Sequence, residues 1–176
     1  FQTKDTLRGL QPDLLRLSQA LPMNHFYGLH TLYPTLSSGQ GGAPYGRLRD
    51  YDNALKRNRD FAANVDEAIR QWRRGEAEGV VDTKLTVRNM IEQLDSQLKL
   101  KPEDSPYWGP LRQTPDDVGA AERTRLTNEF RQSITTVIYP ALTRLRDFLQ
   151  NEYLGHARDG VGEMYMKGGE ALYRYQ

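Results

Sequence analysis

Histidine is the side chain from which metal and acid–base sites are most readily built, and the sequence contains three of them. His25 and His30 are five residues apart, whereas two ligands on one helix face need a spacing of three or four, so we interpret both as ordinary loop histidines. Glu152 and His156 are four residues apart on one helix face, and we expect a surface ion pair between them. No HExxH sequence occurs. The sequence therefore predicts no metal ligands and no catalytic residues in this chain.

Glycine-rich and nucleophilic segments predict no further chemistry. The run Gly39–Gly42 follows no strand and lacks the Lys-Ser/Thr pair that contacts phosphate, so we interpret it as a turn. The chain has no cysteine nucleophile and no serine in a strand–turn–helix context. The glycines near the C-terminus are interpreted as hinges and caps: Gly160, Gly162, Gly168 and Gly169. The sequence assigns no substrate-binding residue.

The overall composition limits the classes of partner. The 24 Lys and Arg residues nearly balance the 23 Asp and Glu residues, for a formal net charge of +1. Nucleic-acid-binding domains concentrate basic charge, so we expect no nucleic-acid partner, and we interpret the cluster Arg70, Arg73 and Arg74 as a solvated helix face. No apolar run approaches the roughly 18 residues that a transmembrane helix needs, so no membrane span is expected. The absence of cysteine excludes disulfides and leaves both an exported or periplasmic and a cytoplasmic location open.

Helical periodicity dominates the chain and no alternating strand pattern occurs, so the predicted fold class is all-α, a helical layer or bundle. We expect a helix over residues 10–21 and a long loop over residues 22–46 that aromatic side chains pin to the body. Residues 47–79 indicate two amphipathic helices, and residues 83–99 indicate another, capped by Asp82 or Thr83. The aromatic residues of the loop are Phe26, Tyr27, Tyr33 and Tyr45.

The longest predicted element is a helix over residues 120–158, which follows a proline-rich connector over residues 100–119 anchored by Tyr107 and Trp108. The apolar stripe of this helix continues past Pro140, where a missing backbone hydrogen bond predicts a kink. A straight helix of this length would span roughly 55–60 Å. A compact domain of this size is about 40 Å across. We therefore expect an antiparallel helical layer in which the long helix either bends sharply or protrudes.

The two ends of the sequence suggest a fragment of a larger helical protein. The chain begins at Phe1 rather than Met, and a truncated helix start lies at residues 169–176 after a glycine-rich link. We expect residues 1–176 to form a single all-helical domain or fragment. Its expected partners are the remainder of its own parent chain or a second copy, through exposed helix faces. If the stripe Leu142, Leu145 and Leu149 is buried within the chain, the unit is a self-sufficient module, whereas an open stripe indicates a piece that lacks its other half.

Several segments of the sequence resemble a known family. They are PMNHFYGLHTLYPTL from Pro22, RRGEAEGVVDTKLTVRNMIEQL from Arg73, SPYWGPL from Ser105, YPALTRLRDFLQNEYLGHAR from Tyr139 and VGEMYMKGGEALYRYQ from Val161. Together they resemble the N-terminal part of the bacterial domain-of-unknown-function 885 family, over nearly the whole chain from about Pro22 on.

That resemblance implies a larger, mostly helical protein, similar in architecture to zinc metallopeptidases of the HExxH type, including the Taq-type carboxypeptidases. Zinc is then expected in the missing C-terminal part and not in this chain. The resemblance implies that this chain forms a wall of the substrate cleft, supports the metal half, and brings the aromatic loop from Phe26 to Tyr45 and the link from Met164 to Gly169 near the cleft. Family members often carry export signals. The alternative is a stand-alone helical protein-interaction module that uses its long helix as a partner surface.

Overall fold

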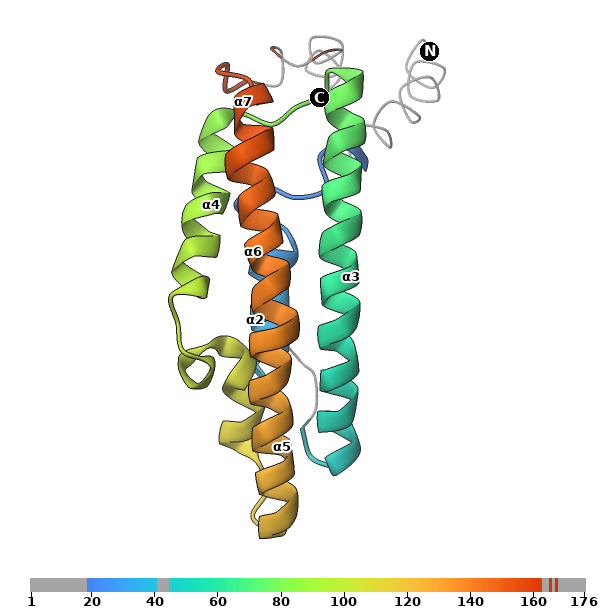
Figure 1. Cartoon of the computed structure of the whole chain (residues 1–176), viewed down its shortest axis with the longest axis vertical. Coiled ribbons are helices and arrows are strands. Elements are labelled where there is room, and N and C mark those ends of the chain that lie inside the picture. The colour runs from blue at the N-terminus through green and yellow to red at the C-terminus, as the bar shows by residue number, and fades with distance from the viewer. Residues whose placement is uncertain (1–18, 41–44, 163–164, 166, 168–176) are drawn as a thin grey trace, which may run out of the picture.

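In the computed structural model, which describes residues 19–40, 45–162, 165 and 167, the fold is all-α, as predicted. Three helical rods of different lengths lie side by side (Figure 1). Within the described residues no strand occurs, and the one bridge joins Thr83 to Arg158. The elements are α2 (Leu29–Ser37), α3 (Leu48–Glu78), α4 (Lys84–Leu98), the 3-10 helices η1 (Pro102–Asp104) and η2 (Pro106–Gln113), α5 (Ala120–Ser133), the π turn η3 (Ile134–Ile138), α6 (Tyr139–Phe148), the π turn η4 (Leu149–Tyr153) and α7 (Leu154–His156).

The elements from α5 to α7 form one continuous helix, here called the long helix, which runs parallel to α3 and antiparallel to α4 (Figure 1). The predicted antiparallel arrangement is therefore confirmed for α4 and wrong for α3. The physical reason is the connection, because α4 and the two 3-10 helices return the chain to the starting end of α3 before the long helix begins. The ion pairs between the two helices confirm the parallel direction, because the residue numbers increase together along both. With the α3 residue first, these pairs are Asp52–Arg125 at 3.2 Å, Asp66–Arg144 at 3.0 Å and Arg73–Glu152 at 2.7 Å.

The long helix passes Pro140 without the sharp bend expected from the sequence (Figure 1). Proline offers no N–H to the carbonyl four residues earlier, and its ring crowds that turn. The preceding turn widens into the π turn η3, in which the N–H of Tyr139 donates to the Ile134 carbonyl, five residues back. A π turn adds room within the helix, so the defect is absorbed locally and the helix axis continues.

The apolar stripe of the long helix is buried within this chain. Leu142, Leu145 and Leu149 are 0%, 1% and 0% exposed, and they belong to one core cluster with residues of α2, α3 and α4. This stripe is therefore not the exposed face through which a second copy could pair, and pairing of copies through other helix faces stays a prediction. The stripe instead joins α3 to α4, and it supplies the burial that holds the three rods together.

The segment predicted as two helices over residues 47–79 is the single helix α3. The apparent break between Leu55 and Phe61 comes from Asn58, which interrupts the apolar pattern but is 3% exposed. Its amide is satisfied inside the protein, because the Tyr33 hydroxyl donates to Asn58 Oδ1 at 2.6 Å and Asn58 Nδ2 donates to Ser133 Oγ at 2.9 Å. A buried polar side chain with hydrogen bonds to both its oxygen and its nitrogen thus continues the inward face of the helix. Helix α3 ends at a left-handed glycine, Gly79.

The region predicted as a long loop over residues 22–46 contains the helix α2, with Pro34 inside it. Proline leaves the His30 carbonyl without its usual helical partner. Gln97 of α4 donates to that carbonyl at 2.8 Å, so the defect is satisfied from outside the helix. The prediction of an irregular loop is wrong because Pro34 was taken to exclude a helix, and the hydrogen bond from Gln97 cannot be seen in the local sequence. The predicted packing of the loop aromatics against the body is confirmed for Tyr33 and Tyr45, which are both buried.

The proline-rich connector forms η1 and η2 and packs on α2. Tyr107 is 1% exposed, and its hydroxyl donates to Gln97 Oε1 at 2.9 Å, which confirms its predicted role as an anchor. Gly109 lies so close to the end of α2 that a Cβ atom there would approach the Ser38 carbonyl oxygen to 2.3 Å. The connector is therefore a packed support for α2 rather than an irregular link.

The prediction for residues 83–99 is confirmed, since α4 begins after Thr83, whose Oγ1 accepts from the Thr86 N–H at 3.1 Å. The helix predicted over residues 10–21 lies almost wholly outside the described residues, and the helix start predicted over residues 169–176 lies entirely outside them.

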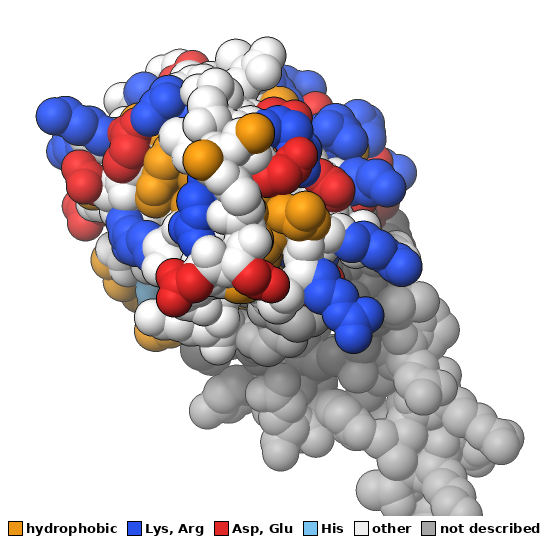
Figure 2. Space-filling model, turned by 90° about the horizontal axis from the view of Figure 1, so that it is seen from below, with side chains coloured by type: hydrophobic (Ala, Val, Ile, Leu, Met, Phe, Trp, Pro, Cys, Tyr) orange, Lys and Arg blue, Asp and Glu red, His pale blue; other side chains and the backbone are white. Residues whose placement is uncertain are grey.

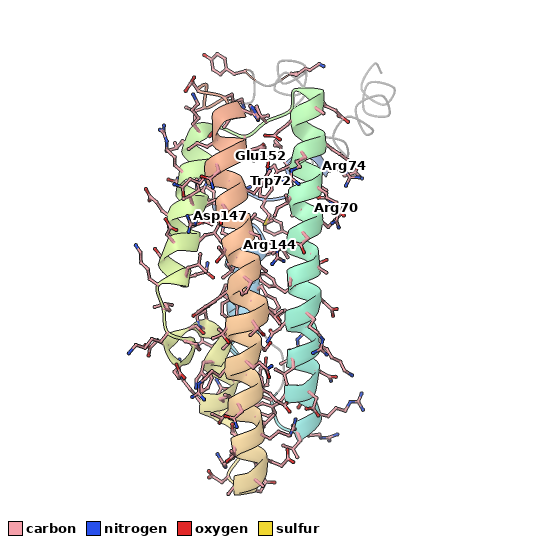
Figure 3. The ribbon with its side chains drawn as sticks, in the orientation of Figure 1. Arg70, Trp72, Arg74, Arg144, Asp147 and Glu152 are labelled. Atoms are coloured by element: carbon pink, nitrogen blue, oxygen red, sulfur yellow. The ribbon has the colours of Figure 1, made fainter. Side chains whose placement is uncertain are left out.

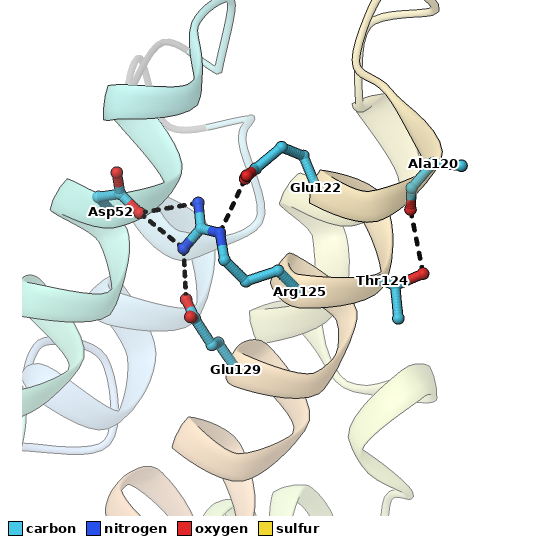
Figure 4. A network of polar contacts seen from close by, with 6 residues as sticks. All are labelled: Asp52, Ala120, Glu122, Thr124, Arg125 and Glu129. Carbon is cyan, nitrogen blue, oxygen red and sulfur yellow. Dashed lines mark hydrogen bonds and ion pairs between the residues drawn. The ribbon is translucent and has the colours of Figure 1, made fainter.

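Arg125 ties the start of the long helix to α3 (Figure 4). Its guanidinium donates to Glu122 at 2.8 Å, to Glu129 at 2.8 Å and to Asp52 of α3 at 3.2 Å. The hydrogen bond to Glu122, and then those to the other two carboxylates, raise the pKa of Arg125 above its ordinary value. Because the groups are partly solvated, the network fixes the relative position of the two helices more than it adds stability.

We expect Leu145→Ala to lower the free energy of unfolding by about 2–5 kcal/mol, the usual cost of a cavity left by a buried leucine. Leu85→Ala is the matched control, because Leu85 is 54% exposed and its loss should cost roughly 0.5 kcal/mol or less. Guanidinium titration followed by circular dichroism measures both values. Equal effects of the two substitutions would contradict the burial of the stripe.

Candidate functional site

A charged groove of about 610 Å³ lies between α3 and the α6–η4 part of the long helix. Figure 3 shows Arg144, Asp147 and Glu152 along the long helix, and Arg70 on the neighbouring helix α3. Two ion pairs cross this region, and in each the guanidinium donates from both Nε and Nη2. Arg144 donates to Asp66 at 3.0 and 3.0 Å, and Arg73 donates to Glu152 at 2.7 and 2.8 Å. The groove therefore presents both signs of charge in fixed, paired positions.

The chemistry of this groove suits ionic ligands. The Arg73 guanidinium holds the pKa of Glu152 below its ordinary value, and the Arg73 guanidinium carbon lies 5.4 Å from the ring centroid of Phe148. Arginine binds carboxylates through two parallel N–H···O hydrogen bonds, so the carboxylate of a ligand can take the place of a carboxylate of the protein. The arrangement can thus bind and orient a charged chain end.

Each of the two residues that the sequence paired at the end of the long helix has a partner on α3 instead. His156 Nδ1 pairs with Glu76 of α3 at 2.9 Å, and Glu152 pairs with Arg73. The predicted ion pair between Glu152 and His156 is therefore wrong. Their partners come from the parallel helix α3, which the spacing along one helix could not indicate.

A second groove, of about 670 Å³, lies between α2 and α4 and includes both His25 and His30 in its lining. His30 is 1% exposed, and its Nε2 lies 3.0 Å from Gln93 Oε1. Gln93 uses its Nε2 to donate to the His25 carbonyl at 2.9 Å, so its oxygen faces His30 and the proton of His30 sits on Nε2. The Nδ1 atoms of both histidines are buried without a protein partner.

Burial lowers the pKa of His30 and so favours the neutral form of the ring. The interpretation of His25 and His30 as ordinary loop histidines is corrected in one respect, since His30 lies on α2 and is a buried contact to α4. Within the described residues, no group of three or more His, Cys, Asp or Glu side chains is placed to hold a metal ion.

Next to this groove, four large apolar side chains face the solvent from α2 and the turn before it. We call this set the α2 face: Phe26, Tyr27, Leu32 and Leu36, which are 81%, 63%, 48% and 37% exposed. The surrounding sequence contains no Asp, Glu, Lys or Arg between Arg16 and Arg47, although such residues make up 27% of the chain. The α2 face is therefore apolar and uncharged, in contrast to the charged groove on α3.

Asp82 is a buried carboxyl group at the junction of α3, α4 and the end of the long helix. It is 8% exposed, and Trp72 Nε1 donates to its Oδ2 at 3.3 Å. Its backbone N–H donates to the Tyr153 hydroxyl at 2.9 Å, and its carbonyl accepts from the Arg158 N–H at 2.9 Å. Burial raises the pKa of Asp82 from 3.8 to about 6. This carboxyl group supports the junction and faces neither groove.

The lower end of the molecule carries side chains of both charges (Figure 2). Figure 2 shows basic and acidic side chains interspersed over the lower end of the molecule. Among the described residues, no helix combines the length and apolar character that a bilayer crossing requires.

A known family accounts for nearly the whole chain. Residues 2–176 match a family described as "Bacterial protein of unknown function (DUF885)". The chain belongs to this family. No curated protein matches the sequence. Among solved structures, that of "the putative lipoprotein from Colwellia psychrerythraea" superposes with a TM-score of 0.78 at 18% identity, over 86% of this chain and 26% of that one.

Membership of the DUF885 family confirms the resemblance found in the sequence, while its zinc peptidase character stays a prediction. The likeness to the Colwellia protein shows the fold, and this chain spans about a quarter of that protein's length. The exposure of Phe26 and Tyr27 was not anticipated. The signal that could have indicated it is the absence of charge between Arg16 and Arg47, since a charge-free segment on a charged protein is typical of an interface.

We expect Asp82→Asn to remove a pH-dependent loss of stability. Between pH 3.8 and about 6 the folded protein retains a proton on Asp82 that the unfolded chain has lost, so this group's contribution to the free energy of unfolding falls as the pH rises through that window. The free energy of unfolding of the variant, relative to that of the native protein, should therefore increase by up to about 3 kcal/mol as the pH rises from 4 to 7. Asparagine can still accept the Trp72 hydrogen bond.

Guanidinium titrations at several pH values measure this difference, and Asp159→Asn controls for the loss of one surface charge. The comparison must be made between variants, because His30, whose pKa is lowered, acts in the opposite direction and destabilises the fold as the pH falls below 6.5. If the difference in free energy of unfolding between Asp82→Asn and the native protein does not change with pH, the raised pKa of Asp82 is contradicted.

Proposed function

We propose that this chain is the non-catalytic helical part of a zinc-dependent, peptidase-like protein of the DUF885 family. In that protein it forms one wall of the substrate cleft and supports the part that holds the metal. The observation that carries the proposal is the superposition on the Colwellia protein, in which the same helical fold makes up about a quarter of a much longer chain. A unit used in this way contributes surfaces to a larger site.

The charged groove is the surface proposed to face the cleft. It is open, its arginines are held in place by Asp66 and Glu152, and a peptide end carries charges that such groups can bind. The aromatic segment from Phe26 to Tyr45 contributes less to a cleft than expected, because Tyr33 and Tyr45 are buried in the core. Most of the link from Met164 to Gly169 lies outside the described residues.

The proposed setting is the cell envelope. This setting is supported by the Colwellia protein, which is described as a "putative lipoprotein", since bacterial lipoproteins are exported. A cytoplasmic location is the alternative. Zinc is proposed for the part of the family protein beyond this chain.

A second candidate function, a stand-alone helical interaction module, is favoured by one specific observation. The stripe Leu142, Leu145 and Leu149 is buried within the chain, so the three rods have a core of their own. In that case the exposed α2 face would be the partner surface. The two functions differ in whether zinc and peptide hydrolysis accompany the complete protein.

The first test compares two proteins: the 176-residue chain, and the product of the complete reading frame that contains it. We expect the complete product to hold zinc, measured by mass spectrometry of the metal, and to cleave peptides until a chelator removes the metal. The 176-residue chain should do neither. Tight zinc binding with peptide cleavage by the 176-residue chain would overturn the proposal, and a complete product without zinc or peptidase activity would favour the interaction module.

The second test concerns the charged groove. In the complete product, Arg144→Gln should raise KM on the order of ten-fold, about the effect of losing one charge-assisted hydrogen bond, with the zinc content unchanged. Arg125→Gln is the matched control, since it removes a comparable ion pair between the same two helices at the other end. Equal KM values for the two variants would exclude the groove from the cleft.

A further inference from the structure

The α2 face is displayed by a turn that is rigid before any partner arrives. Asn24 Oδ1 accepts from the N–H groups of Phe26 and Tyr27, at 2.9 and 2.8 Å. Gly28 lies against Met23, where a Cβ atom would approach the methionine Cβ to 2.8 Å, and Met23 is 3% exposed. The two aromatic side chains are thus held outward by a packed, hydrogen-bonded base, which reduces the entropy that binding would cost.

The helix that follows is equally well supported. Its inner side is fixed by Tyr33, by the contact of His30 to Gln93 and by the donation from Gln97. Leu32 and Leu36 are four residues apart and lie on its outer side, one turn above the other. A supported helix with leucines on its free side presents the kind of surface that another helix packs against.

The composition of the α2 face determines the chemistry of its partner. Interface cores are depleted in charge and enriched in aromatic residues, and the α2 face has both properties. Without Lys or Arg between positions 16 and 47, this segment lacks the basic residues that attract nucleic acid or an anionic membrane. The aromatic and uncharged composition of the α2 face therefore favours an apolar protein surface as its partner.

The size of the Colwellia protein identifies which protein supplies that surface. The fold of this chain occupies 26% of that chain, so in that architecture the unit is covalently joined to roughly three times its own length of additional protein. Building on the function proposed above, we propose that the α2 face docks against the remaining part of the same family protein. The occupant is an apolar helical surface of that part, and the docking joins the helical unit to the metal-holding part.

Hydroxyl-radical footprinting of the complete reading-frame product and of the 176-residue chain tests this proposal. Phe26 and Tyr27 should be oxidised severalfold more slowly in the complete product than in the chain alone. Tyr51 is the internal control, because it is 0% exposed in this chain and should react slowly in both. Equal oxidation of Tyr27 in both proteins would overturn the docking while leaving the zinc and peptidase test unaffected.

Two other occupants give different results, and each would overturn the proposal. A second copy would protect Tyr27 in the 176-residue chain as its concentration rises. A membrane would protect Tyr27 in the chain when neutral phosphatidylcholine vesicles are added. Conversely, protection of Tyr27 in a complete product that lacks zinc and peptidase activity would support the docking and reject the proposed function.

A paired substitution gives an independent measurement. Leu32→Glu with Leu36→Glu should shift the melting temperature of the 176-residue chain by no more than about 2 °C, since both side chains are partly solvated there. In the complete product the same change should lower the melting temperature clearly, because it would bury carboxylates in an apolar interface. Equal shifts in the two proteins would contradict the docking.

Discussion

The burial of one apolar stripe on the long helix is the interaction on which the rest of this structure depends. Leu142, Leu145 and Leu149 lie between α3 and α4 and are almost fully removed from solvent. The stripe can face both helices along its length because the π turn before Pro140 keeps the helix axis continuous. A sharp bend at that proline would have turned half of the stripe away from its partners. The ion pairs to α3 then set the register of helices already held by burial.

The same framework explains why the protein has two contrasting surfaces. Where α3 and the long helix run in parallel, the margin of their contact is charged and bridged by paired side chains such as Asp66 and Arg144. On α2, by contrast, hydrogen bonds from α4 and packing against the 3-10 helices hold the inner side, and the outer side is uncharged and apolar. A charged surface suits solvent and ionic ligands, whereas an apolar one suits another protein. The two proposals follow this division.

Sequence patterns predicted what depends on local spacing and did not predict what depends on distant partners. The all-α class, the helix α4 with its Thr83 cap, and the position of the long helix follow from helical periodicity. Asn58 led to a false break in α3, because nothing local shows that Tyr33 and Ser133 satisfy its amide. The helix α2 was missed in the same way, since the partner of the carbonyl freed by Pro34 is on α4. The direction of α3 relative to the long helix is likewise a property of the whole chain.

The central proposal is that this helical unit belongs to a longer, zinc-dependent, peptidase-like protein, and the complete reading frame around residues 1–176 tests it most directly. Determining its sequence from the source genome is sufficient. The account predicts that the frame continues well beyond Gln176 and encodes an HExxH sequence, in which two histidines one helical turn apart can bind zinc. A frame that stops at Gln176, or one that continues without such a sequence, would contradict it.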